Sequence, residues 1–242
     1  MIMVTTAVIL AAGLGTRFGK RTEKIPKGFI PVGGKPMVIR SIETLIACDI
    51  TRIIIGTGFG KEAYEALGDR YPGIECEFSP RYAETNSMYT LFNCRNVIGN
   101  DDFLLLESDI IYNKTAITEL LDDPHPDIML ITPVTKFQDQ YYVAHDADGR
   151  LVNCSTDGTA IDAQGELVGI HKLSSAFYKR MCRDYAAKAE ASPKLGYEYE
   201  LLHMSQALIP MYVLNSTCTH WYEIDDEKDL NYAEKIIVPY LD

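Results

Sequence analysis

Apolar residues along the chain alternate between short runs typical of buried strands and longer segments with helical spacing. Strands are predicted at 7–11, 52–56, 74–78, 103–108 and 127–133, and helices near 36–48, 61–70, 86–97, 114–121, 174–190 and 198–206. A strand at 220–224 and a helix at 227–237 follow near the end of the sequence. This alternation predicts an α/β fold with a mostly parallel sheet flanked by helices.

Two stretches interrupt the alternation. Residues 136–172 are typical of short strands and turns, and residues 192–200 of a Ser/Pro/Gly loop rich in tyrosine. The chain shows no internal repeat, low-complexity tract or flexible linker. We therefore predict a single domain over residues 1–242, with a small inserted lobe.

A glycine-rich turn follows the first predicted strand, in the sequence AVILAAGLGTRFGKRTEKIPK at 7–27. Glycines allow the backbone amides of such a turn to approach phosphate oxygens. The spacing departs from the dinucleotide fingerprint, because Gly19 comes one residue late. It also departs from the P-loop, because Leu14 and Arg21 replace a glycine and a Ser or Thr. Arg17 and Lys27 add positive charges that suit a triphosphate.

The charge distribution supports a small anionic ligand. The formal net charge of the 242 residues is −11, yet residues 1–42 contain seven basic side chains and one acidic side chain. An acidic chain is a poor partner for duplex nucleic acid, which needs a basic face. The basic segment coincides with the glycine-rich turn, which favours a nucleotide-sized polyanion. The hydrophobic content of 47% excludes intrinsic disorder.

Cysteine usage and hydropathy predict the compartment. The six cysteines are scattered without a Cys-x-x-Cys pair, a pattern typical of reduced thiols rather than of a disulfide framework or zinc site. The apolar opening lacks a basic n-region, so it is predicted to be a strand and not a signal peptide. No other stretch approaches the length of apolar residues that a membrane span requires. We expect a cytoplasmic protein without membrane or nucleic-acid partners.

Acidic residues follow two of the predicted strands. Asp109 comes after the apolar run 103–106, and the alternation of Glu223, Ile224 and Asp225 predicts both carboxylates on one strand face. Magnesium is commonly held by one or two carboxylates together with substrate phosphates, at the edge where parallel strands end. Asp109 and Asp225 are therefore candidate metal ligands. Helix capping is the alternative function for both, and Asp226 is predicted to be a cap.

The A-A-G-x-G-T-R pattern with Pro26-Lys27 resembles the signature of nucleotidyltransferases that make sugar nucleotides and related activated alcohols. Four further segments, ETNSMYTL (84–91), FLLLESDIIY (103–112), LVGIHKLSS (167–175) and WYEIDDEKDL (221–230), resemble the small-alcohol-phosphate cytidylyltransferases. Within these, the sequence is most similar to enzymes that activate 2-aminoethylphosphonate and are often fused to other phosphonate-pathway enzymes. The resemblance covers nearly the whole chain and weakens at 136–166 and 188–220.

This resemblance implies a Rossmann-like nucleotidyltransferase fold, CTP as the donor and Mg²⁺ as the cofactor. It implies that Arg17 and Lys27 are catalytic residues on the triphosphate and that Asp109 and Asp225 bind the metal. Residues expected to contact the nucleotide are Leu10, Ala11, Ala12, Gly13, Gly15 and Thr16, with Gly58 and Ser87, which follow predicted strands.

The acceptor site is expected in the insertions at 136–172 and 192–217. Aromatic side chains would enclose a quaternary ammonium, whereas a primary ammonium also needs carboxylate or carbonyl acceptors. Candidates for the acceptor are Arg81 and Lys172 for its phosphonate or phosphate oxygens, and Tyr141, Tyr197, Glu198 and Trp221 for its other end. The 192–200 loop is a candidate lid. These residues do not decide between a choline and an aminoethyl headgroup.

We therefore predict an enzyme that transfers CMP from CTP to 2-aminoethylphosphonate and releases pyrophosphate, with the choice of acceptor resting on the resemblance. A phosphonate oxygen is already deprotonated near neutral pH, so the reaction needs no general base. Phosphocholine or a sugar 1-phosphate are alternative acceptors. A CTP-binding module without turnover is the alternative of a different class. Association as a homodimer, or fusion to another phosphonate-pathway enzyme, is also open.

Overall fold

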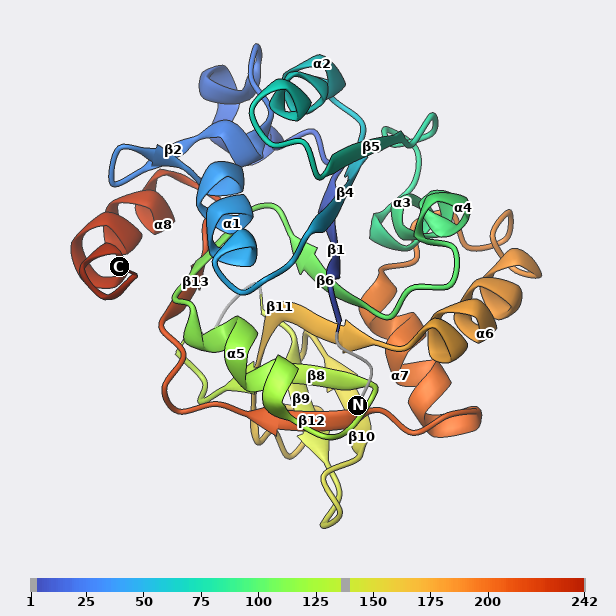
Figure 1. The fold of residues 1–242 in the computed structure, drawn as a ribbon. Helices are drawn as coiled ribbons and strands as arrows, with labels where there is room; N and C mark the ends of the chain where they lie inside the picture. The colour runs from blue at the N-terminus through green and yellow to red at the C-terminus, as the bar shows by residue number, and fades with distance from the viewer. Residues whose placement is uncertain (1–3, 136–139, 242) are drawn as a thin grey trace.

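A computed structural model describes residues 4–135 and 140–241. Its central sheet has nine strands, and its path runs in the order β12, β8, β11, β6, β1, β4, β5, with β9 and β10 attached to the start of β11 (Figure 1). The strands are β1 (Thr6–Ala11), β4 (Arg52–Thr57), β5 (Ile74–Phe78), β6 (Phe103–Glu107), β8 (Ile128–Thr132), β9 (Tyr142–His145), β10 (Leu151–Ser155), β11 (Gly165–Leu173) and β12 (Tyr212–Asn215). Strands β6, β1, β4 and β5 are parallel, and β11 is antiparallel to β6.

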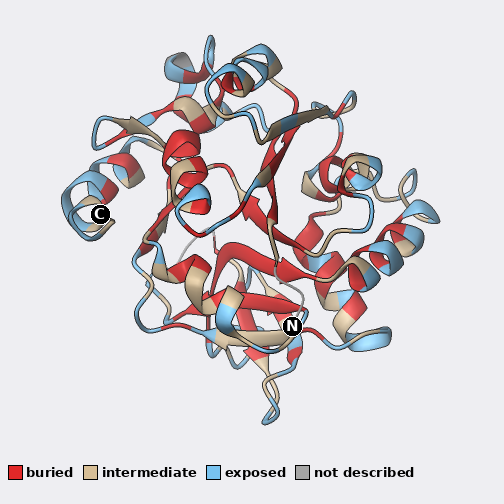
Figure 2. Ribbon diagram, viewed as in Figure 1, coloured by how far each residue is buried: buried red, intermediate tan, exposed pale blue. Residues whose placement is uncertain are grey.

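Helices cover both faces of this sheet because its central strands are apolar on both sides (Figure 2). Ile9 of β1 belongs to a core that packs under α1, α2 and α5, whereas Val8 belongs to a core under α3, α6 and α7. The helices are α1 (Met37–Ile46), α2 (Lys61–Glu65), α3 (Ser87–Asn93), α4 (Arg95–Ile98), α5 (Thr115–Asp122), α6 (Ser175–Ala186) and α7 (Tyr197–Ala207).

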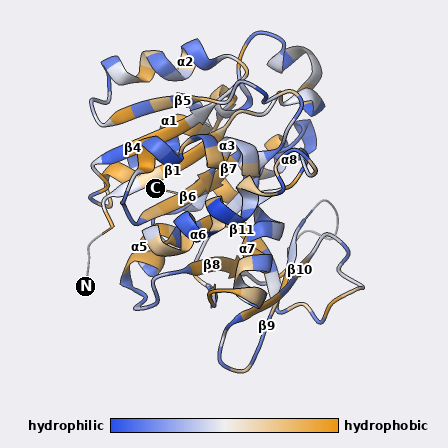
Figure 3. Ribbon diagram, turned by 90° about the vertical axis from the view of Figure 1, so that its right-hand side faces the viewer, coloured by the Kyte–Doolittle hydropathy of each residue, from blue (hydrophilic) through white to orange (hydrophobic). Residues whose placement is uncertain are grey.

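Strand β11 joins the parallel strands to an extension at one end of the molecule. Its first residues pair with β9, and its last four pair with β6. The register against β8 shifts between Leu167 and His171, around Gly169, whose φ of 78° favours glycine. Strands β9 and β10 extend beyond the main body of the sheet (Figure 3).

A third, smaller cluster lies beside the sheet near the end of the chain. Strand β13 (Trp221–Glu223) pairs antiparallel with β7 (Ile110–Tyr112), and β2 (Pro31–Val32) pairs with β3 (Lys35–Pro36). Helix α8 (Glu227–Tyr232) continues into a π-helical turn over 233–237. Ile30, Ile111 and Ile224 pack together in this cluster. The end of β13 is thereby held next to the end of β6.

The predicted mostly parallel sheet with flanking helices is confirmed, and the predicted elements lie within a few residues of those observed. Strands β2, β3, β7 and β12 were not predicted. The tyrosine-rich segment enters α7 at Tyr197, so residues 197–200 form a helical turn rather than part of a loop. Strand β13 ends at Glu223, so Asp225 does not share a strand face with it. Residues 136–139 of the predicted insertion lie outside the described residues.

Among the described helices, none combines the length and apolar composition needed to cross a membrane.

Candidate active site

A cavity of about 530 Å³ opens where β1 and β6 end, between the glycine-rich turn and the start of α7. Fourteen residues that the sequence placed in the site line this cavity: Leu10, Ala11, Ala12, Gly13, Gly15, Thr16, Arg17, Lys27, Ser87, Asp109, Tyr141, Glu198, Trp221 and Asp225. The cavity therefore joins the glycine-rich turn, acidic strand ends and aromatic residues in one space.

The glycine-rich turn forms one wall of the cavity. Gly13 has no heavy atom within 4 Å of the position a Cβ would take, so its backbone is open on that side. Gly15 has a φ of 63°, and a Cβ there would lie 3.0 Å from the Cβ of Lys27. The Thr22 hydroxyl donates to the Gly15 carbonyl at 2.8 Å, which holds the turn against the following 3₁₀ helix. Glycine is required here to bring the backbone close to Lys27.

Lys27 places its ammonium between two carboxylates. Its Nζ donates to Oδ2 of Asp109 at 2.6 Å and to Oδ1 of Asp225 at 2.5 Å. Arg17 Nη1 lies 2.9 Å from the other oxygen of Asp225, although the Arg17 side chain is 60% exposed. Burial lowers the pKa of Lys27, but the two carboxylates outweigh this effect and raise the pKa above its ordinary value. Asp109 and Asp225 thus converge on one cation position.

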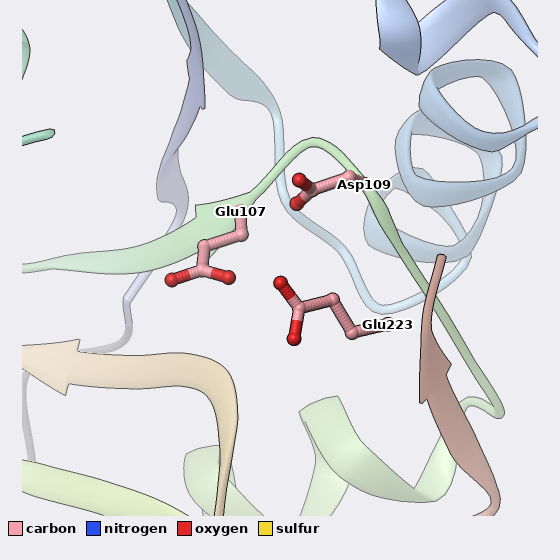
Figure 4. A group of neighbouring side chains, drawn as sticks. All are labelled: Glu107, Asp109 and Glu223. Carbon is pink, nitrogen blue, oxygen red and sulfur yellow. The ribbon is translucent and has the colours of Figure 1, made fainter. Parts of the chain in front are cut away.

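Three carboxylates of the cavity lining also meet, and Asp109 is one of them. One oxygen each of Glu107, Asp109 and Glu223 lie within 4.8 Å of one another, and Figure 4 shows the three side chains pointing toward a common space. Burial, followed by the charge of Asp109, raises the pKa of Glu107 to about 8. The same two causes raise the pKa of Glu223 well above its usual range. Such a group favours a cation, because a bound positive charge offsets the mutual repulsion of the carboxylates.

The β7–β13 pair brings these acids together from distant parts of the sequence. Its register sets Glu223 opposite Ile110, and the Ile224 amide donates to the Asp109 carbonyl at 3.0 Å. Asp226 accepts from two amides at the start of α8, which confirms its prediction as an N-cap. The helix that follows Asp109 has Lys114 at its N-cap instead.

Glu198, in the first turn of α7, faces the same cavity. Its side chain is buried, and its Oε2 has no hydrogen-bond partner among residues 4–135 and 140–241. Burial raises the pKa of Glu198 to about 7. The Gln140 amide donates to Glu223 Oε2 at 3.1 Å, and the Trp221 indole N–H donates to Thr132. The acidic end of the cavity therefore has an unsatisfied acceptor.

Four predicted site residues do not line the cavity. Arg81 pairs with Glu190 at 2.8 Å, and Lys172 Nζ donates to the Asp123 carbonyl at 2.6 Å. Gly58 lies behind the wall, where a Cβ would come within 2.5 Å of the Ala12 carbonyl oxygen. Tyr197 is fully buried and contacts Glu107 instead. Arg81 and Lys172 thus have other partners than an acceptor.

Sequence reasoning missed three charged residues that line the cavity: Glu107, Glu223 and Lys194. Glu107 had a usable signal, since it ends an apolar strand immediately before Ser108-Asp109. Glu223 had a similar signal in its alternation with Asp225. Lys194 had none, because it lies in the connection before α7, whose path follows from packing that the sequence pattern does not reveal.

Residues 7–197, which contain the fold's parallel strands and most of the cavity lining, match the MobA-like NTP transferase domain. The chain belongs to this family. It is 27% identical over 241 residues to a CMP-5'-(3-aminopropyl)phosphonate synthase of Streptomyces rubellomurinus, covering 94% of this chain and 38% of that protein. It is 27% identical over 179 residues to a 2-aminoethylphosphonate cytidylyltransferase of Lancefieldella rimae, and this match covers 74% of this chain and 71% of that protein.

Solved structures support the same fold. The CTP:phosphocholine cytidylyltransferase of Streptococcus pneumoniae superposes with a TM-score of 0.81 at 24% identity, over 97% of this chain and 99% of that one. The Rossmann-like nucleotidyltransferase fold expected from the sequence is thereby confirmed.

Proposed function

We propose that this protein transfers CMP from CTP to 2-aminoethylphosphonate and releases pyrophosphate. The observation that carries the proposal is a single cavity lined by two chemically different groups of residues. One group is the glycine-rich turn with Arg17 and Lys27, which suits the triphosphate of CTP. The other group is Glu107, Glu198 and Glu223, which suit an acceptor with a positive charge.

The charges on the acceptor side favour a primary ammonium over a trimethylammonium. A primary ammonium has three N–H donors, whereas the trimethylammonium of choline has none. Glu198 Oε2 is a buried acceptor without a partner in the described part of the chain, so a donor from the ligand would satisfy it. Two relatives are named for aminoalkylphosphonates, the Streptomyces rubellomurinus synthase and the Lancefieldella rimae cytidylyltransferase, and these names support the same choice of acceptor.

The reaction follows from this placement. A phosphonate oxygen of the acceptor attacks the α-phosphorus of CTP, a new P–O bond forms, and the bond from that phosphorus to the bridging oxygen of pyrophosphate breaks. No proton is transferred, because the attacking oxygen is already ionised. Lys27 and Arg17 stabilise the charge that accumulates on the leaving pyrophosphate. The cavity walls hold the two substrates in line.

A divalent metal, proposed to be Mg²⁺, fits the residues present. Asp109 and Asp225 would hold it, since both already direct an oxygen to the ammonium of Lys27. When bound, such a metal neutralises phosphate charge. With Mg²⁺ in place, Lys27 would be released to bind the phosphates of the nucleotide.

A cytoplasmic location is part of this proposal. All six cysteines are free thiols, four of them buried, as is common in a reducing compartment.

An acceptor panel tests the proposal. The protein is incubated with CTP and Mg²⁺ together with 2-aminoethylphosphonate, phosphocholine, glucose 1-phosphate or no acceptor, and pyrophosphate and products are measured by mass. We expect 2-aminoethylphosphonate to give the highest kcat/KM. Preference for phosphocholine would contradict the choice of acceptor, and tight CTP binding without any product would favour a binding module instead.

A further inference from the structure

A chain of three polar side chains crosses the apolar interior behind the cavity. Tyr197 and His171 are both fully buried, in an otherwise hydrophobic layer beneath α7. The Tyr197 hydroxyl lies 2.6 Å from Glu107 Oε1 and 3.2 Å from His171 Nε2. Of these three side chains, Glu107 lines the cavity.

The direction of the hydrogen bonds follows from the chemistry of each group. Burial lowers the pKa of His171 to about 3, so its imidazole is neutral. When a cation is bound in the cavity, Glu107 is ionised and only accepts, so the Tyr197 O–H donates to it at 2.6 Å. The tyrosine oxygen then accepts from His171, whose proton must lie on Nε2. The other ring nitrogen, Nδ1, has no partner in the described residues, which suits a bare nitrogen better than an N–H.

Glu107 is also held from its other side. A Cβ on Gly169 would lie 3.0 Å from Glu107 Oε2, so the carboxylate rests directly against this glycine of β11. The backbone amide of Tyr197 donates to the Ser87 hydroxyl at 3.0 Å, and Ser87 lines the cavity at the start of α3. Tyr197 is therefore fixed at both its backbone and its hydroxyl.

We propose that Tyr197 and His171 are positioning residues that hold the Glu107 carboxylate in place to bind a cation in the cavity. The inference rests on the proposed function, in which that cation is the ammonium of the acceptor or the divalent metal. Tyr197, expected from the sequence to touch the acceptor, acts through Glu107 instead. His171 acts through Tyr197 by supplying the N–H that keeps the hydroxyl turned toward Glu107.

A double-mutant cycle with Tyr197→Phe and Glu107→Gln tests whether Tyr197 acts through its hydrogen bond to Glu107. The Phe variant keeps the ring and removes only the hydroxyl. We expect it to raise the KM for 2-aminoethylphosphonate about tenfold or more, the size of a lost hydrogen bond to a charged group, with a smaller change in kcat. In the Glu107→Gln background, the same substitution should change KM less than twofold. The proposal is overturned if Tyr197→Phe has an equal effect in both backgrounds, or no effect in either, on both the acceptor KM and the affinity for Mn²⁺, a probe of the metal site.

Two further arms separate the sources of the cation and control for folding. Mn²⁺ affinity is measured by electron paramagnetic resonance across the same cycle with CTP present, and it identifies the metal as the cation if it changes while the acceptor KM does not. Tyr178→Phe is the matched control, because this buried tyrosine donates to the Leu91 carbonyl and does not line the cavity. We expect Tyr178→Phe to leave both the KM for 2-aminoethylphosphonate and the affinity for Mn²⁺ unchanged.

The tautomer of His171 gives a readout that does not depend on variants. Nitrogen-15 NMR of the substrate-bound protein should show the His171 proton on Nε2. A proton on Nδ1 would contradict the proposed hydrogen bond from His171 to the Tyr197 oxygen. If the unmodified protein releases no pyrophosphate with any acceptor, the proposed function fails. The Mn²⁺ arm of the cycle then still tests whether Tyr197 acts through Glu107.

Discussion

Lys27 neutralises the two carboxylates that are the candidate metal ligands. It holds Asp109 and Asp225 together at 2.6 and 2.5 Å, and it borders the glycine-rich turn through Gly15. We expect Lys27→Ala and Asp109→Ala each to lower turnover at least about a hundredfold, the scale of losing one electrostatic group that acts on the transition state. Pyrophosphate release at saturating CTP measures this.

Lys61→Ala is the control for this prediction, because Lys61 does not line the cavity and contacts only groups outside it, Glu65 on α2 and the ring of Phe78, among the contacts of the described residues. Near-normal turnover in both the Lys27 and Asp109 variants would contradict the proposed site.

Glu198 links function to stability through its pKa. The pKa rises from 4.5 to about 7 on folding, so the folded state binds a proton more tightly than the unfolded chain does. Stability from this group is therefore lost as pH rises from about 4.5 through 7. We expect Glu198→Gln to raise the Tm of the ligand-free protein by about 2 °C or more at pH 8, and by less at pH 4.5. Glu190→Gln, an exposed glutamate, should show no such pH dependence.

The residues at strand ends could be predicted because their position follows from the order of the elements. The glycine-rich turn, Asp109 and Asp225 all follow apolar strands and meet at one edge of the sheet. Lys172 could not be placed from the pattern, since the register shift around Gly169 decides which face of β11 it occupies. Arg81 could not be placed either, because its partner Glu190 lies more than 100 residues away in the sequence.

At the scale of elements, α8 fixes the end of β13. Asp226 accepts from the amides of Lys228 and Asp229, while Asp229 in turn accepts from the Asp225 amide at 3.0 Å. We expect Asp226→Ala to destabilise the protein by about 1 kcal/mol, a Tm decrease of about 2–4 °C, and to weaken Mn²⁺ binding by loosening Asp225. Asp226→Ser keeps a capping oxygen and should behave nearly as the unmodified protein. Equal Tm losses in both variants would contradict the capping explanation.

The apolar pattern predicted most elements because it records burial directly, and the central strands are buried throughout. Strand β12 escaped because its residues are only partly buried or exposed, so they lack a clear alternation. Helix α7 begins at Tyr197, within one residue of the predicted helix near 198–206, but the loop predicted at 192–200 ends before Tyr197, since Tyr197 and Leu201 are anchored in the core under the helix. Tertiary packing decides both cases, and a single sequence does not contain it.

At the scale of the whole molecule, the charges are arranged so that an acidic chain can hold an anionic ligand. The net charge is −11, and five carboxylates line a cavity proposed to bind CTP. The binding of CTP should therefore depend on added metal. We expect removal of divalent ions with EDTA to weaken CTP binding at least about tenfold, as measured by isothermal titration calorimetry. Unchanged affinity would show that Arg17 and Lys27 suffice alone.

The ammonium of Lys27 has a consequence for the order of binding. It already occupies the point on which Asp109 and Asp225 converge, so in the resting protein these two carboxylates have an internal counter-ion. A free metal ion must compete with that tethered charge, whereas a nucleotide offers Lys27 new oxygens and vacates the position. We expect Mg²⁺ alone to leave the Tm of the protein nearly unchanged, Mg²⁺ with CTP to raise it, and Lys27→Met to gain a response to Mg²⁺ alone. The protein would thus bind its metal only together with the nucleotide, and changes in the concentration of free Mg²⁺ would not affect the ligand-free protein.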